Sequence, residues 1–285
     1  MEFIYSTRNP DCPTAYSSLD AMHTRCEILL PRVPEADARA LVDSVWSMVR
    51  EADARYNRFL PGSALSAVNR EASRADVEVD EEMFLVLEFC DTFRRATKGY
   101  FDISANEQSR VPGRAWVLDP ARHTVRFSRE GMRLDLGGFA KGFVLEKAAR
   151  AVAGATDCAL LTFGGSSTAA IGTHPLGGPW PVSVAHPYYG NRTAHTFRLA
   201  GRSLSVSGKD PHGKGHIIDP TTGNTVEKDG LVAVTGPSAM VTEVLSTALW
   251  VAPAGERKDI LSAFEGYEAW DILCLADGTA RTWKL

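Results

Sequence analysis

The stretch RLDLGGFAKGFVLEKAAR, residues 133–150, contains an abrupt change of backbone pattern around which the rest of the chain is organised. An apolar strand is predicted to end at Asp135, two glycines follow, and an amphipathic helix begins near Lys141. Glycines at a strand-to-helix junction often let the backbone approach a phosphate group. The spacing is neither the G-x-G-x-x-G fingerprint of dinucleotide-binding folds nor a Walker loop. The stretch therefore indicates phosphate binding of another kind.

The segments around this stretch alternate between helices and short strands. Besides the helix that runs from the opening stretch to about Gly154, apolar periodicity and capping residues predict helices at residues 36–54, 63–69, 80–99, 238–250 and 256–264. Strands are predicted at residues 24–30, 115–118, 124–127, 132–135, 159–163, 232–235, 272–274 and 282–283, with strand-and-turn character over 168–218. Segregated helices and meandering strands predict one α+β domain over residues 1–285, with a mixed, mainly antiparallel sheet and flanking helices. We expect a flexible N-terminal segment over residues 1–20.

Composition and charge restrict the classes of function. A net charge of −4 gives no reason to expect nucleic acid or an acidic membrane surface as a partner. No apolar run approaches the roughly 20 residues that span a bilayer, and the N-terminus does not have the pattern of a signal peptide. The five cysteines are scattered, odd in number and never spaced C-x-x-C. A reduced, cytoplasmic protein without a zinc site is therefore expected.

The predicted helix at 238–250 carries a candidate metal site. Glu243 and Thr247 are four residues apart and lie on one helical face, with Ser246 beside them. A carboxylate and hydroxyls are hard oxygen donors of the kind that Mg²⁺ accepts. Taken alone, however, a glutamate near a helix N-terminus is explained more simply by the helix macrodipole.

Three further motifs combine polar or aromatic side chains with glycines. In GHIIDPTTGNTV, residues 215–226, His216 stands close to a turn and could act as an acid or base, or could simply bond a backbone carbonyl. In KGYFDIS, residues 98–104, two aromatics and Asp102 could contact a flat ring and its hydrogen-bond donors, or could be core residues beside a turn. TFGGSST, residues 162–168, fits a bulge or a tight turn where two backbones meet.

The order of these motifs is more specific than any one of them. M-x-T, S-x-x-x-x-x-N, G-x-F-D, D-L-G-G-x-A-K-G, F-G-G, S-x-S-G, H-I-I-D-P-x-T-G and E-x-L-S-T-A follow one another from Met22 nearly to the final strands. Together they resemble the ApbE family of flavin transferases, which are FAD:protein FMN transferases. The resemblance implies an enzyme that cleaves the pyrophosphate of FAD with Mg²⁺, attaches FMN through a phosphoester to a Ser or Thr of a target flavoprotein, and releases AMP.

The same resemblance implies roles for individual residues. It assigns FAD contacts to Met22, Phe59, Tyr100, Phe101, Asp102, Asp135, Lys141 and Ile218. It assigns the metal to the carbonyl of Gly138 and to Glu243, Ser246 and Thr247. His216 matches the family's histidine beside the flavin pocket, and we interpret it as the base that helps to activate the acceptor hydroxyl.

Several positions depart from the family's usual pattern. Glu243 stands where the family usually has aspartate, and His23 replaces the glycine of M-G-T. Ser104 replaces the threonine of F-D-x-T, and Ser166 stands where many members carry aspartate after F-G-G. The longer side chain of Glu243 bears on metal preference, because Mg²⁺ demands near-ideal octahedral geometry. Two alternatives to transfer therefore stay open: hydrolysis of FAD to FMN and AMP, and a flavin-binding module without turnover.

Overall fold

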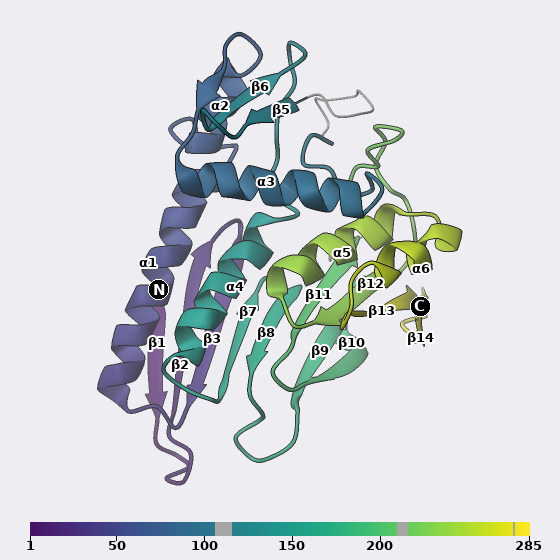
Figure 1. Ribbon diagram of the computed structural model, residues 1–285. Helices are drawn as coiled ribbons and strands as arrows, with labels where there is room; N and C mark the ends of the chain where they lie inside the picture. The colour runs from purple at the N-terminus through teal and green to yellow at the C-terminus, as the bar shows by residue number, and fades with distance from the viewer. Residues whose placement is uncertain (106–115, 210–215, 276) are drawn as a thin grey trace.

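Figure 1 shows a computed structural model of the chain, which describes residues 1–105, 116–209, 216–275 and 277–285. Within these ranges the main sheet has nine strands, and each neighbouring pair is antiparallel. In spatial order the strands are β1 (Glu2–Ser6), β2 (Thr14–Ala21), β3 (Thr24–Pro31), β7 (Ala159–Phe163), β8 (Ser167–Ile171), β11 (Ser203–Gly208), β12 (Leu231–Gly236), β13 (Glu268–Cys274) and β14 (Ala280–Lys284). The predicted α+β class with a mainly antiparallel sheet is confirmed.

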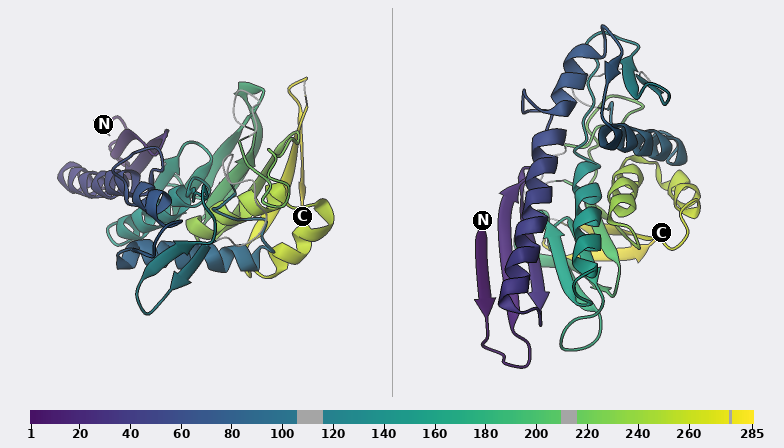
Figure 2. Two further views of the ribbon diagram at one scale, coloured as in Figure 1. Left: turned by 90° about the horizontal axis from the view of Figure 1, so that it is seen from above. Right: turned by 60° about the vertical axis from the view of Figure 1, so that its left-hand side comes forward.

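One face of this sheet is covered by a layer of helices, as Figures 1 and 2 show. The layer consists of α1 (Glu35–Tyr56), α4 (Ala140–Ala153) and α5 (Ala239–Val251), with α6 (Ala254–Ser262) following α5. Their apolar sides form much of two buried cores with the strands beneath. The buried Trp46 of α1 donates its indole N–H to Ser17 Oγ of β2 at 2.8 Å, which ties this helix to the sheet. The helical layer thereby positions α4 and α5 side by side over β8, β11 and β12.

The opposite face is covered by a hairpin of β9 (Trp180–His186) and β10 (Tyr189–Leu199). Trp180, Val184 and Phe197 of the hairpin are buried against Leu204 of β11 and Ala233 of β12. Because side chains alternate along a strand, β11 sends its other set of side chains, which includes Ser205, toward the helices. β11 is therefore apolar on the hairpin side and supplies hydroxyl groups on the helical side.

A smaller unit lies beyond one end of the helical layer. α3 (Glu81–Ala96) crosses that end, and α2 (Ala64–Glu71) lies near it with a small sheet in the order β4 (Val77–Glu78), β6 (Thr124–Phe127) and β5 (Trp116–Asp119). Residue 115, predicted as the start of β5, lies outside the described residues. Asp80 accepts a hydrogen bond from the backbone N–H of Met83 and so caps α3 as predicted.

Two predicted segments differ from the structure. Residues 1–20 were expected to be flexible, but they include β1 and β2, and Tyr5 donates its hydroxyl to the Val33 carbonyl at 3.2 Å. Residues 132–135 were expected to form a strand, but no strand forms there. Their backbone groups are bonded by a side chain and a loop instead of a neighbouring strand, as described below.

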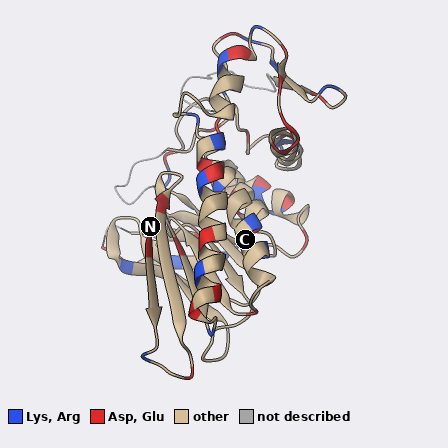
Figure 3. Cartoon of the chain, turned by 90° about the vertical axis from the view of Figure 1, so that its left-hand side faces the viewer, with Lys and Arg blue, Asp and Glu red and all other residues tan. Residues whose placement is uncertain are grey.

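Charged positions are mixed along the outer helix. Figure 3 shows basic and acidic positions interspersed on α1, so this helix does not present one sign of charge. Over the part of the chain that the structure describes, none of the helices is both long enough and apolar enough to cross a bilayer.

Candidate functional site

The glycine turn before α4 is held by side chains. Asn69 of α2 donates its amide to the Leu134 carbonyl at 2.9 Å and accepts from the Leu134 N–H at 2.7 Å. The Asp135 N–H donates to the Ile103 carbonyl at 2.7 Å, and Asp135 Oδ1 accepts from the Gly137 N–H at 2.8 Å. Asn69 therefore makes the hydrogen bonds to the Leu134 backbone that a neighbouring strand would otherwise make. This explains why residues 132–135 do not pair with another strand.

Gly142 brings α4 into direct contact with α5. A Cβ atom at residue 142 would lie 2.6 Å from Glu243 Cβ and 2.7 Å from the Ala239 carbonyl oxygen. Only a residue without a side chain allows the two helices to approach so closely. Lys141, the residue before this contact, is thereby placed against Glu243.

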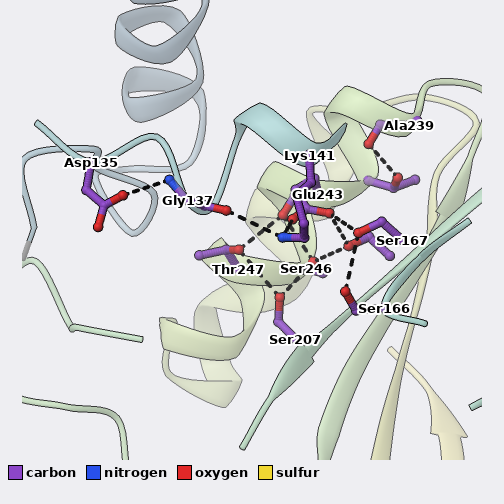
Figure 4. A network of polar contacts seen from close by, with 12 residues as sticks. Asp135, Gly137, Lys141, Ser166, Ser167, Ser207, Ala239, Glu243, Ser246 and Thr247 are labelled. Carbon is purple, nitrogen blue, oxygen red and sulfur yellow. Dashed lines mark hydrogen bonds and ion pairs between the residues drawn. The ribbon is translucent and has the colours of Figure 1, made fainter. Parts of the chain in front are cut away.

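The carboxylate of Glu243 is buried, and Figure 4 marks its polar contacts as dashed lines. Its Oε1 lies 2.5 Å from Lys141 Nζ, and its Oε2 accepts from Ser167 Oγ at 2.5 Å and from Ser205 Oγ at 3.0 Å. Burial would raise the pKa of Glu243, but the Lys141 ammonium and the two serine hydroxyls outweigh burial and hold this pKa below its ordinary value. Glu243 is also beyond the first turn of α5, so the macrodipole explanation does not account for it.

Further oxygen atoms surround this carboxylate. Ser246 Oγ lies 3.1 Å from Ser205 Oγ and 2.8 Å from Ser207 Oγ, and Ser207 Oγ lies 3.4 Å from Thr247 Oγ1. Gly138 is beside Thr247, because a Cβ at residue 138 would stand 3.6 Å from Thr247 Oγ1. The four residues predicted as metal ligands, Gly138, Glu243, Ser246 and Thr247, therefore lie together.

The chemistry of these groups fits a small hard cation. Among the described residues, no group of three or more His, Cys, Asp or Glu side chains could hold a metal ion. The cluster offers one carboxylate, several hydroxyls and backbone carbonyls, which are the ligands that suit Mg²⁺. A positive charge is already accommodated here, because Lys141 Nζ lies between Glu243 Oε1 and the Gly137 carbonyl oxygen, 3.4 Å away. Gly138 and Thr247 could complete such a site with Glu243.

Two of the predicted FAD contacts line one small hollow. Asp102 and Ile218 face it together with Ser104 and Asp219. Asp102 Oδ1 accepts from the N–H and the hydroxyl of Ser104 at 2.8 and 2.7 Å. Burial raises the pKa of Asp102, and the bonds from Ser104 offset only part of that effect. His216, exposed, stands two residues before Ile218.

The aromatic residues beside Asp102 have different environments. Phe101 is 3% exposed and packs in the main core. It therefore fits the alternative interpretation of KGYFDIS, that its aromatics are core residues beside a turn. Tyr100 is partly buried and donates its hydroxyl to Glu256 of α6 at 3.0 Å. Of this pair, only Tyr100 keeps part of its surface accessible.

Phe59 lies on an exposed rim, and Met22 is partly buried against the main core. Met22 and His23 form the turn between β2 and β3, with φ values of 53° and 57°. This left-handed backbone favours glycine, so His23 stands where a glycine would be least strained. Phe59 is 65% exposed, and the His23 ring meets it edge-on with centroids 5.6 Å apart. Arg58 covers the Phe59 ring at 4.3 Å while its Nε lies 2.8 Å from Asp135 Oδ2, which joins the rim to the glycine turn.

The F-G-G motif packs against the M-x-T turn. Gly164 has a φ of +67°, and a Cβ there would lie 2.3 Å from Thr24 Oγ1. The Gly164 N–H also donates to the Arg25 carbonyl at 2.9 Å. The predicted close approach of two backbones at residues 162–168 is confirmed.

Sequence reasoning missed the role of several residues in this site. They are Arg58, Asn69, Ser167, Ser205 and Ser207. Asn69, Ser205 and Ser207 belong to motifs already recognised, S-x-x-x-x-x-N and S-x-S-G, so their motif positions were a usable signal. Arg58 belongs to none of the motifs quoted above, and Ser167 lies in TFGGSST, whose interpretation as a bulge or turn gave its side chain no role.

The fold and the site define an α+β protein with a buried oxygen-donor centre beside a glycine turn. The chain belongs to the ApbE family, whose model matches residues 22–270. It is 26% identical to the FAD:protein FMN transferase of Treponema pallidum, over 86% of this chain and 81% of that protein. It is 25% identical to the protein of the same name from Chlamydia trachomatis, over 74% of this chain and 75% of that one.

Solved structures share the fold. The flavin transferase ApbE from Vibrio cholerae superposes with a TM-score of 0.79 at 19% identity and covers 96% of this chain and 97% of its own. The ApbE protein from Thermotoga maritima gives a TM-score of 0.76 at 22% identity, with coverage of 93% and 96%. The likeness extends over nearly the whole of both chains.

Proposed function

We propose that this chain is a Mg²⁺-dependent FAD:protein FMN transferase. Its substrates are FAD and a flavoprotein with an acceptor Ser or Thr, and its products are the FMN-modified protein and AMP. The observation that carries the proposal is the buried carboxylate of Glu243, which is held by hydroxyls and is linked through Lys141 to the glycine turn at 137–138. The family and the names of its curated relatives support the same activity.

In this proposal the metal is held by the Gly138 carbonyl, Glu243, Ser246 and Thr247. Bound Mg²⁺ supplies positive charge that neutralises the pyrophosphate. Glu243 suits this task because its lowered pKa keeps it ionised at neutral pH. Lys141, whose side chain is 24% exposed, supplies a second positive charge to the phosphates.

The remaining assigned residues hold the flavin nucleotide. Asp135, at the glycine turn, and Asp102, in the hollow with Ile218, offer carboxylate acceptors to ring or ribose donors. We further assign Met22, Phe59, Tyr100 and Phe101 to the FAD pocket, with Phe59 offering an exposed face for stacking and Phe101 supporting the turn from the core.

The transfer itself exchanges the phosphoanhydride bond of the FAD pyrophosphate for a phosphoester bond to the acceptor. The acceptor hydroxyl oxygen bonds to the phosphorus of the FMN half while the bond from this phosphorus to the bridging oxygen breaks. The hydroxyl proton passes to the His216 imidazole, and AMP leaves with the bridging oxygen. His216 suits this role because a neutral imidazole nitrogen can accept a proton. We also propose that the protein works in the reducing cytoplasm, where its five buried cysteine thiols stay unpaired.

A nucleotide assay tests the proposal. Purified protein is incubated with FAD and either Mg²⁺ or EDTA, with and without an acceptor flavoprotein, and FMN and AMP are quantified. We expect AMP release that needs both Mg²⁺ and the acceptor. Free FMN in step with AMP, independent of the acceptor, would instead establish hydrolysis, and intact FAD in every mixture would establish a binding module.

A further inference from the structure

The two oxygens of the Glu243 carboxylate have separate environments. Oε2 accepts from Ser167 Oγ at 2.5 Å and from Ser205 Oγ at 3.0 Å, and both serines are 1% exposed. Oε1 lies 2.5 Å from Lys141 Nζ, on the side of the Gly137 carbonyl. Oε2 is thus hydrogen-bonded to two buried hydroxyls, and Oε1 is paired with the ammonium group of Lys141 (Figure 4).

The two serines are fixed by the sheet. Ser167 of β8 and Ser205 of β11 are directly opposite each other in the antiparallel ladder. Opposite residues in such a ladder project to the same face with neighbouring Cβ atoms. The hydroxyls therefore rise side by side from two central strands, whereas Glu243 reaches them from α5. A glutamate has three rotatable side-chain bonds, and two hydrogen bonds to a rigid sheet restrict the rotation of its carboxylate.

We propose that Ser167 and Ser205 are positioning residues that determine which cation binds. By holding Oε2 they leave Oε1 as the single carboxylate ligand. A single oxygen suits Mg²⁺, which takes six ligands in strict octahedral geometry, whereas Ca²⁺ takes more ligands and often binds both oxygens of one carboxylate. The serine pair therefore selects Mg²⁺ against Ca²⁺. This inference rests on the proposed metal-dependent function and adds the origin of its metal selectivity.

Metal binding without FAD tests the inference. Mn²⁺ bound to the protein is followed by electron paramagnetic resonance and displaced by Mg²⁺ or by Ca²⁺, which gives the ratio of the two affinities. Because both affinities are measured on one preparation, a partly unfolded fraction cancels from their ratio. The variants are Ser167→Ala, Ser205→Ala and the double substitution. Ser203→Ala is the matched control, since Ser203 is a buried serine two residues earlier on β11 and lies outside the carboxylate network.

We expect the Mg²⁺ affinity of the double variant to fall on the order of tenfold, because removing the hydrogen-bond partners of a metal ligand typically weakens metal binding by at least this factor. Its Ca²⁺ affinity should fall less or rise, because the freed Oε2 can then bind Ca²⁺. Ser205→Thr, which keeps a hydroxyl, should restore the Mg²⁺ preference, and Ser203→Ala should keep it. An unchanged Mg²⁺ to Ca²⁺ ratio in the double variant would overturn the serine role while leaving the proposed function standing. Failure of the unsubstituted protein to bind any of the three ions would overturn the metal-dependent function itself.

Discussion

At the scale of single residues, the site depends on a buried ion pair. Glu243 is 4% exposed, and a carboxylate at such a position is costly unless a cation and hydrogen bonds compensate it. Lys141 supplies the cation at 2.5 Å. Removing one partner of a buried pair usually costs far more than removing both, because the remaining charge is left without compensation.

Lys141→Met should therefore lower the free energy of unfolding by about 3 to 5 kcal/mol in the absence of divalent metal. The double substitution Lys141→Met with Glu243→Gln should be less destabilised than the sum of the two single ones. Chemical denaturation of the four proteins measures this coupling. Added Mg²⁺ should recover stability in Lys141→Met but not in the double variant. Additive single effects would show that the two side chains do not interact.

For Asp102 we expect stability and function to make opposite demands, because its buried carboxylate lowers stability at neutral pH and contributes to FAD binding. Burial raises its pKa, so Asp102 is protonated more readily in the folded protein than in the unfolded chain. The contribution of protonated Asp102 to the free energy of unfolding is fully present below its pKa in the unfolded chain, near 3.8. It is lost as the pH rises through the higher pKa of Asp102 in the folded protein. At neutral pH the protein therefore carries the cost of a buried charge.

Asp102→Asn should remove that cost, because the amide oxygen can still accept both bonds from Ser104. We expect the variant's thermal midpoint to exceed that of the unsubstituted protein at pH 7 and the difference to shrink toward pH 4. FAD affinity should fall in the same variant if the carboxylate contacts the nucleotide. A midpoint difference that does not change with pH would rule out titration of Asp102 as its cause.

At the scale of secondary-structure elements, the crossing of α4 and α5 places the two halves of the site together. The glycine turn belongs to the entry of α4, and the candidate ligands belong to α5. Gly142 permits this contact at the Cβ of Glu243 and the carbonyl of Ala239. The same glycine would be unfavourable in an ordinary helix, so close packing accounts for its presence.

Gly142→Ala should force the helices apart and cost about 1 to 3 kcal/mol of stability, together with most of the metal-dependent activity. Gly255→Ala provides a control, because a Cβ at that exposed position in α6 meets nothing within 4 Å. That control should be neutral or stabilising by up to about 1 kcal/mol. Thermal unfolding and metal titration of both variants measure the difference. Equal behaviour of the two would show that the close packing at Gly142 is not required.

The elements that the sequence predicted correctly are those whose ends are determined by residues a few positions away. Ser63, Asp80 and Ser238 cap their helices through hydrogen bonds to nearby backbone N–H groups, which a sequence encodes within a few residues. Residues 132–135 were mispredicted because the partner of their backbone is the side chain of Asn69, 65 residues earlier. The strands β1 and β2 were missed because local pattern did not distinguish them from a flexible end.

At the scale of the whole molecule, the sheet assembles groups that are distant in sequence. Ser167 and Ser205 reach Glu243 across 76 and 38 residues. Local periodicity contains no information on the strand order that makes β8 and β11 neighbours. Only the order of motifs along the chain indicated a shared site, and it indicated the motif residues Glu243, Ser246 and Thr247 but not Ser167.

The central claim is that this assembled site transfers FMN to a protein. The most direct test is the intact mass of an acceptor flavoprotein after incubation with FAD, Mg²⁺ and either the unsubstituted protein or Glu243→Gln. We predict that the acceptor gains one covalently bound FMN with the unsubstituted protein and none with Glu243→Gln or with EDTA. An acceptor of unchanged mass, while FAD is converted to free FMN and AMP or remains intact, would contradict the claim.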